Sequence, residues 1–264
     1  MSPRPGPGGP TPTNRLVPAE LAQEVATVLW RERDHFLRIA VVPIVATFAI
    51  EFWAFASVPE NFPTVEPHGE PPDLGWMLIW LLAVFPMTLF SANCQRIALL
   101  GPSAVAGLGL RWGSRETRYL ATAVLINLIA ALAVALPAAL MLQTKQSPIL
   151  LFLVIVPFYI YLTLRLSFAL TAAALERPGF LGWSWTATRG IGISLVLATA
   201  LIVLPLEIAA LLFSWLLAAT GLHEMAPLAS HFLRTFAAYV PTAATSVTIA
   251  LAYGRLSKGT GRGT

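Results

Sequence analysis

Six long apolar segments constrain the fold of this chain more than any other feature of its sequence. A helix needs about 20 apolar residues to cross a bilayer, and it satisfies its backbone polar groups within the segment itself. The segments that reach this length are Leu37–Val58, Trp76–Leu100, Tyr119–Leu142, Pro148–Ala174, Ile191–Ala219 and Phe232–Tyr253. They predict an all-α polytopic membrane protein, with six transmembrane helices in a single domain over residues 37–254.

The composition agrees with this prediction and excludes other classes. Only 11% of the residues are charged and 56% are hydrophobic, whereas a soluble domain carries about 25% charged residues. The formal net charge is +4, but the basic residues are scattered between the apolar runs instead of forming one face. This distribution excludes nucleic acid as a partner. A single cysteine, Cys94, excludes an internal disulfide and a cysteine-rich metal site.

The segments that flank the predicted spans differ from one another in composition. Residues 1–15 hold five prolines and three glycines, which predicts a disordered tail and not a signal peptide. Residues 255–264 predict a second disordered tail, which is basic. Residues 16–36 carry apolar side chains at helical spacing among charges, which predicts an amphipathic juxtamembrane helix on the cytoplasmic membrane surface. Its apolar positions are Leu21, Val25, Val28, Leu29 and Phe36.

The distribution of basic residues predicts the orientation of the spans. Of the 17 Lys and Arg residues, 15 lie in the N-terminal region as far as Arg38, in the second and fourth connections with the adjoining span ends that carry Arg96 and Arg165, or after the last span. The other connections and their adjoining span ends hold only Lys145 and Arg234. Because basic connections stay in the cytoplasm, we expect both termini to be cytoplasmic.

The sequence also matches itself weakly at a shift of 71 residues. This shift aligns Pro86 with Pro157, Trp112 with Trp183, and Thr117 with Thr188. The pattern is typical of a duplicated helical hairpin. Chance matches are also common in a chain rich in Leu and Ala, so both interpretations stand at this point.

Two stretches carry a resemblance to known families. They are "LERPGFLGWSWTATRG" over residues 175–190 and "TIALAYGRL" over residues 248–256. Together they resemble a loose group of six-helix bacterial membrane families, which includes the membrane domain of some glycerophosphodiester phosphodiesterases and several integral membrane proteins without an assigned activity. The resemblance implies a six-helix fold and marks a cytoplasmic interface motif. Its residues are Glu176, Trp183, Ser184, Thr188 and Arg189.

The resemblance departs from the group at the C-terminal end, and it does not extend to catalysis. Members of the group end in a Tyr-x-x-Leu-Arg-like element. At this position the chain has Tyr253-Gly254-Arg255-Leu256, in which the last two residues are inverted. The phosphodiesterases carry their chemistry in a soluble barrel with a His-Arg-Gly and then a Pro-Glu-Asn-Thr element. This chain has Pro59-Glu60-Asn61 before His68-Gly69 and no barrel.

Other catalytic and metal-binding signatures are missing from the sequence. No serine lies in a Gly-x-Ser-x-Gly turn. The His and Glu residues of the predicted outer loops match no established ligand spacing. We therefore expect a protein that is not an enzyme and that holds no metal and no cofactor.

Five polar residues inside the predicted spans are the strongest candidates for a functional layer. Ionisable groups cost free energy in the membrane and often mark a functional site. Glu51 and Glu207 fall at a similar depth, and Arg165 is a possible ion-pair partner for Glu207. The competing interpretation is structural, with polar groups that bridge helices and an Arg165 that snorkels to the interface. The layer consists of Glu51, Asn93, Asn127, Arg165 and Glu207.

These features favour a non-enzymatic scaffold, accessory or regulatory component of the bacterial inner membrane. Its basic cytoplasmic face would meet anionic lipid headgroups, and a membrane protein is its expected partner. A small transporter or permease-like component that uses the polar layer is the main alternative. It draws some support from the proline in each span, since proline bends helices. A membrane-embedded enzyme that acts on lipid ranks third.

Overall fold

The computed structural model describes residues 16–56, 74–143, 148–177, 181–221 and 226–259, and these residues contain helices and no strand. The predicted tail at residues 1–15 lies outside this part of the chain. The elements are α1 (Pro18–Arg31), α2 (Arg33–Ala56), α3 (Leu74–Leu100), the 3-10 turn η1 (Pro102–Ala104), α4 (Ser114–Gln143), α5 (Pro148–Leu166), α6 (Phe168–Ala174), α7 (Leu181–Ala187), α8 (Gly192–Ala219) and α10 (Pro227–Gly259).

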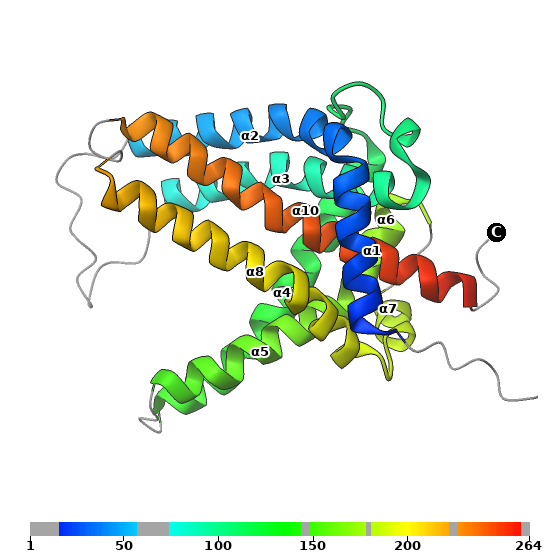
Figure 1. The fold of residues 1–264 in the computed structure, drawn as a ribbon. Coiled ribbons are helices and arrows are strands. Elements are labelled where there is room, and N and C mark those ends of the chain that lie inside the picture. The colour runs from blue at the N-terminus through cyan, green and yellow to red at the C-terminus, as the bar shows by residue number, and fades with distance from the viewer. Residues whose placement is uncertain (1–15, 57–73, 144–147, 178–180, 222–225, 260–264) are drawn as a thin grey trace, which may run out of the picture.

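Four long helices form the body of the molecule. Helices α2, α3, α10 and α8 run side by side in that order, and α1 crosses the ends of α8 and α10 (Figure 1). Helices α4 and α5 pack against each other as a hairpin that diverges from this body (Figure 1). The short elements η1, α6 and α7 gather near α1, so one end of the molecule holds most of the irregular structure.

Five helical segments are long and apolar enough to cross a membrane, by length and composition. They are Arg33–Trp53, Ser114–Ala135, Leu153–Ala174, Gly192–Ala219 and Leu228–Ser257. They match the first, third, fourth, fifth and sixth predicted spans, which supports the prediction of an all-helical, multi-pass architecture. The second predicted span corresponds to α3, a helix of 27 residues that carries Asn93, Gln95 and Arg96 near its C-terminal end.

The fourth predicted span is not one continuous helix. Helix α5 ends at Leu166, and α6 begins at Phe168 after a single non-helical residue, Ser167. The Ser167 hydroxyl donates to the Leu164 carbonyl at 2.6 Å, which satisfies a backbone acceptor at this break. Prolines occupy the interiors of six helices without ending them. They are Pro43, Pro86, Pro137, Pro157, Pro205 and Pro241.

Helix α1 is amphipathic and packs its apolar face against protein, while Trp30 on it is exposed. Its residues Leu21 and Val25 are fully buried, and the helix lies against α8 and α10. Glu24 accepts two hydrogen bonds from Arg255, at 2.7 and 3.1 Å. The predicted segment 16–36 is also interrupted, because α1 ends at Arg31 and α2 begins at Arg33.

The prediction of a disordered tail from residue 255 is wrong for its first residues. Helix α10 continues to Gly259, and Arg255 anchors it to α1 through Glu24. The tail sequence contains no apolar run that would predict a helix. The ion pair with Glu24 involves a helix that is distant in the sequence, so the tail sequence alone does not reveal it. Residues 260–264 lie outside the described residues.

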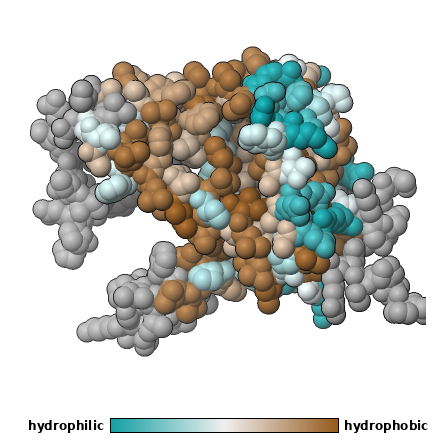
Figure 2. Space-filling model, viewed as in Figure 1, coloured by the Kyte–Doolittle hydropathy of each residue, from teal (hydrophilic) through white to brown (hydrophobic). Residues whose placement is uncertain are grey.

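Polarity is sorted along the long axis of the bundle. In Figure 2 hydrophilic residues gather at the end where α1 and the α3–α4 connection lie, while hydrophobic residues cover the sides of α8 and α10. Many large apolar side chains on these walls are exposed, including Leu201, Leu204 and Leu211 of α8. An exposed apolar wall with a polar end suits a helix bundle that has lipid around its sides.

Candidate functional site

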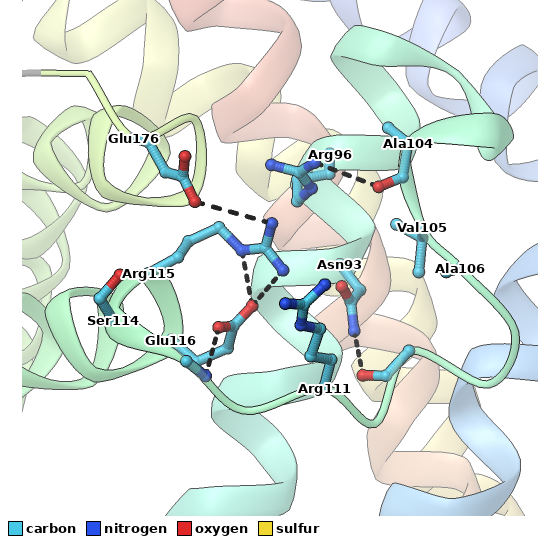
Figure 3. Close-up of a pocket in the computed structure, with 12 residues that line it drawn as sticks. Asn93, Arg96, Ala104, Val105, Ala106, Arg111, Ser114, Arg115, Glu116 and Glu176 are labelled. Carbon is cyan, nitrogen blue, oxygen red and sulfur yellow. Dashed lines mark hydrogen bonds and ion pairs between the residues drawn. The ribbon is translucent and has the colours of Figure 1, made fainter.

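A cavity of about 460 Å³ opens at the polar end of the molecule. It lies between the end of α3, the connection 101–113, the start of α4 and the residues that follow α6. Figure 3 shows arginine side chains from different elements converging on it. Its charged lining residues are Arg96, Arg111, Arg115, Glu116 and Glu176.

Asn93 shapes one wall of the cavity. Its side chain is buried, and Nδ2 donates to the Gly109 carbonyl at 2.8 Å. Gly109 has a φ of +69°, and a Cβ atom there would lie 2.6 Å from Asn93 Nδ2. Only glycine meets both requirements without strain, so this pair fixes the connection against α3.

Glu116 and Arg115 organise the start of α4. Glu116 is buried, and its Oε2 accepts a hydrogen bond from the Gly113 backbone N–H at 2.9 Å. This is the glutamate half of a capping box, which satisfies a backbone donor at a helix N-terminus. The other carboxylate oxygen contacts Nε and Nη2 of Arg115. Arg115 Nη1 also lies 4.0 Å from Glu176, so Arg115 is compensated by two carboxylates.

Arg96 connects three elements around the cavity. Its Nη1 donates to the Ala174 carbonyl at the end of α6, and its Nη2 donates to the Ala104 carbonyl in η1, each at 3.1 Å. The Nε atom is buried and has no hydrogen-bond partner. An unpaired buried donor costs about 1–3 kcal/mol, so Arg96 carries an unsatisfied N–H in a residue that lines the cavity.

Glu176 occupies a backbone position at which glycine is usual. Its φ is +57°, and the N–H groups of Glu176 and Arg177 donate to the carbonyls of Ala173 and Ala172. This is the Schellman pattern that ends a helix, with glutamate at the left-handed position. A non-glycine residue there costs about 1–2 kcal/mol, and it places a carboxylate at the cavity.

Arg111 lines the cavity without an ion-pair partner among the described residues. Its side chain is exposed and makes no hydrogen bond or ion pair with any described residue, and Figure 3 shows it pointing between Asn93 and Glu116. Three arginines and two glutamates leave one positive charge in excess. The planar N–H donors of arginine match phosphate and carboxylate oxygens, so the arrangement favours an anionic ligand.

A second polar cluster joins the predicted interface motif to Arg165. Arg165 is buried, donates to Thr188 Oγ1 at 3.1 Å and to the Trp185 carbonyl at 2.6 Å, and stacks 3.6 Å from the Trp185 ring centroid. The Ser184 hydroxyl donates to the Arg165 carbonyl at 2.7 Å. Arg165 therefore holds α7 against the end of α5.

The other motif residues occupy different places. The Trp183 ring packs against Tyr253 of α10, with 5.5 Å between ring centroids. Tyr253 belongs to the second stretch that carries the family resemblance, and the two stretches thus meet in the fold. Arg189 is exposed, and Glu176 belongs to the cavity.

The predicted intramembrane layer does not converge on one centre. Glu51 accepts a hydrogen bond from Thr235 at 2.9 Å, and His231 Nε2 lies 3.2 Å from the same oxygen. Asn127 accepts a hydrogen bond from the Tyr159 hydroxyl at 2.7 Å.

The predicted pair of Glu207 with Arg165 is not formed. Glu207 is exposed on α8 and contacts no polar group among the described residues. Arg165 is already bound to α7, and Asn93 lines the cavity. The four residues other than Glu207 bind neighbours on adjacent elements, which is why a common depth along the spans did not bring the five residues together.

The cavity was not predicted from the sequence, although several of the residues that line it had been considered for other reasons. Arg96, Arg111 and Arg115 entered the prediction only as a count of basic residues in one connection. Asn93 and Glu176 were assigned to two different groups. The available signal was the concentration of three arginines and Glu116 within about 20 residues around a glycine-rich turn.

The two connections that the 71-residue shift aligns fold differently. Thr117 is exposed in the first turn of α4, whereas Thr188 is buried between α7 and α8. Trp112 precedes α4 outside any helix, whereas Trp183 lies within α7. The aligned residues of the two connections therefore do not share a local structure, although Pro86 and Pro157 both lie inside helices.

We expect Arg165→Lys to lower the free energy of unfolding by about 1.5–3 kcal/mol, because lysine lacks the planar fork that donates to Thr188 and to the Trp185 carbonyl at once. Thermal unfolding in detergent measures the change. Arg189→Lys is the matched control: it alters an exposed arginine on the same connection and should change stability by less than about 0.5 kcal/mol. Equal effects of the two substitutions would contradict a structural role for Arg165.

Comparison with family models, with characterised proteins and with solved structures finds no match for this chain. The resemblance to the six-helix bacterial families therefore stays a prediction, and the geometry of the cavity is the basis for the functional proposal.

Proposed function

We propose that this chain is a multi-pass protein of the bacterial inner membrane that acts without catalysis, as a scaffold, accessory or regulatory component. It crosses the membrane six times, with α3 as the second span, and both termini lie in the cytoplasm. Its polar end meets anionic lipid headgroups, and a second membrane protein contacts its apolar wall.

One observation carries the proposal: an arginine-lined cavity at the polar end of a bundle with apolar sides. The same end holds α1, the end of α10, the connection that contains Arg111, and the end of α5 that carries Arg165. Basic residues concentrate on the cytoplasmic side of membrane proteins. Anionic headgroups attract them by about 1 kcal/mol for each Lys or Arg near the surface.

The places of the polar side chains favour a supporting role over transport. Glu51, Asn127 and Arg165 each bind neighbours on adjacent elements, which is how polar groups hold membrane helices together. A transport path instead needs such groups to line a shared route. These residues do not form a shared centre, so their positions do not support the permease alternative.

Glu207 favours a partner protein at α8. It is exposed between Leu204, Ile208 and Leu211, which are exposed apolar side chains of the same helix. A carboxylate that faces lipid is costly, and intramembrane carboxylates usually find a polar partner. A helix of another protein that offers such a group would remove this cost.

The topology predicts which side each connection occupies. Alkaline phosphatase fused after His68 or Lys145 should be active outside the cytoplasm, and a fluorescent protein fused after Gly107 or Thr264 should fluoresce inside, because the basic connections stay in the cytoplasm. Activity of the phosphatase at Gly107 would contradict the orientation.

The partner surface predicts a position-specific crosslink. A photoreactive residue at Leu211, which is 68% exposed, should form an adduct with another polypeptide in native membranes, and Glu207→Leu should reduce its yield severalfold. Leu132 of α4, which is 65% exposed, is the matched control. Equal yields from the two positions, unaffected by Glu207→Leu, would contradict a partner at α8.

The lipid contact predicts a selective stabilisation. Phosphatidylglycerol added to the purified protein in neutral detergent should raise the melting temperature by several degrees more than phosphatidylcholine. Each kcal/mol of binding corresponds to about 2–4 °C in a chain of this size. The difference should shrink in 0.5 M salt, because salt screens surface charges. Identical stabilisation by both lipids would contradict the proposal.

A further inference from the structure

An apolar groove of about 280 Å³ lies between α2 and α3, close to the arginine-lined cavity. Every side chain that lines it is apolar. Helix α2 contributes residues such as Ala46 and Ile50, α3 contributes Phe85 and Leu89, and Leu110 closes one end.

The groove and the cavity lie on one face of α3. Leu82, Phe85 and Leu89 line the groove, and Asn93 and Arg96 line the cavity. Their spacing of three or four residues places them along one stripe of the helix. From Leu82 to Asn93 the stripe spans about 16 Å at a rise of about 1.5 Å per residue. This length is close to half of the ~30 Å hydrocarbon core, which is the depth of one leaflet.

The α3–α4 connection joins the two hollows. Leu110 lines the groove, and the next residue, Arg111, lines the cavity. Trp112 packs against Phe85 of the groove, with 5.3 Å between ring centroids. Leu108, Leu110 and Trp112 are exposed although they are apolar. Exposed tryptophan and leucine beside an arginine are typical of a segment at the level of lipid headgroups.

The donors that remain free point to the chemistry of the ligand. Arg115 is compensated by Glu116 and Glu176. Arg96 Nε is buried without a partner, and Arg111 has no ion-pair partner among the described residues. A tetrahedral phosphate group accepts hydrogen bonds from two such arginines at once.

We infer that the groove and the cavity form one site for a phosphate-bearing lipid, with an acyl chain between α2 and α3 and the phosphate at Arg111 and Arg96. This inference rests on the proposed contact with anionic lipid and makes it specific to one place. Free phosphate would bind through the same chemistry as a lipid headgroup, but it has no acyl chain to occupy the groove. A change in the groove therefore distinguishes binding of a lipid from binding of free phosphate.

The test compares two arginines that carry the same charge. Binding of dioctanoyl phosphatidic acid to the protein in neutral detergent should weaken about tenfold or more in Arg111→Gln, since glutamine cannot replace the charge-assisted hydrogen bonds to the phosphate. Arg118 is exposed on the same end and lies outside the cavity lining. Arg118→Gln should weaken binding less than about threefold, because it leaves the lipid's hydrogen bonds intact.

Two more variants test the other parts of the site. Ala46→Phe narrows the groove and should weaken the binding of dioctanoyl phosphatidic acid while leaving that of inorganic phosphate unchanged. Glu176→Gln removes a carboxylate from the cavity and should strengthen binding of the lipid severalfold. Melting temperatures without ligand verify that each variant is folded. Arg111 makes no hydrogen bond or ion pair with a described residue, so we expect its substitution to leave the fold unchanged. A loss of binding in this variant therefore reports on the site itself.

Two outcomes would overturn the inference. Equal losses in Arg111→Gln and Arg118→Gln would show general attraction of basic residues, and the proposed preference for anionic lipid would survive. Inorganic phosphate that binds as tightly as the lipid, with no effect of Ala46→Phe, would assign the cavity to free phosphate. Loss of the lipid preference in the unaltered protein would instead contradict the proposed function itself.

Discussion

The exclusion of charge from apolar surroundings is the constraint on which this structure depends. The long helices are apolar over most of their length, and each buried charge near their ends has specific partners. Glu116 caps α4 and pairs with Arg115, and Arg165 bonds to α7. A buried charge without a partner costs several kcal/mol. The short elements therefore fold around the charges at one end of the bundle, and this folding forms the cavity.

Three features of the cavity depart from this constraint or from ordinary backbone geometry. Arg96 Nε is buried without a partner, Glu176 takes a left-handed conformation where glycine is usual, and Arg111 has no ion-pair partner among the described residues. Each of these features lowers stability or leaves a donor unused, and all three lie at one cavity. Local costs that gather in one place are typical of a binding site.

Much of the fold followed from the lengths of the apolar segments. The apolar runs predicted the long helices, because a segment of about 20 apolar residues has few alternatives to a membrane helix. The same argument failed at two helix ends. The break at Ser167 leaves no gap in the apolar pattern, and the helical extension of α10 depends on the pairing of Arg255 with Glu24, which lie 231 positions apart.

The candidate site was harder to predict than the fold, because it depends on which neighbours each polar group finds. Depth along a span suggested that Glu207 and Arg165 meet, but rotation about the helix axis decides the contact. Arg165 turns towards α7, and Glu207 turns outward on α8. Helix rotation is set by packing, and nearly uniform Leu, Ala and Val surfaces carry little information about it.

The sequence by itself determined the class of this protein, the positions of its long helices and the segregation of its basic residues, because these depend on local hydrophobicity and charge. The tertiary structure decided how α1 docks, that α7 closes over Arg165, and that Asn93, Arg96, Arg111 and Glu176 surround one cavity. These arrangements join residues far apart in the chain, and only the packing of α3, α4 and α6 places the cavity residues around one hollow.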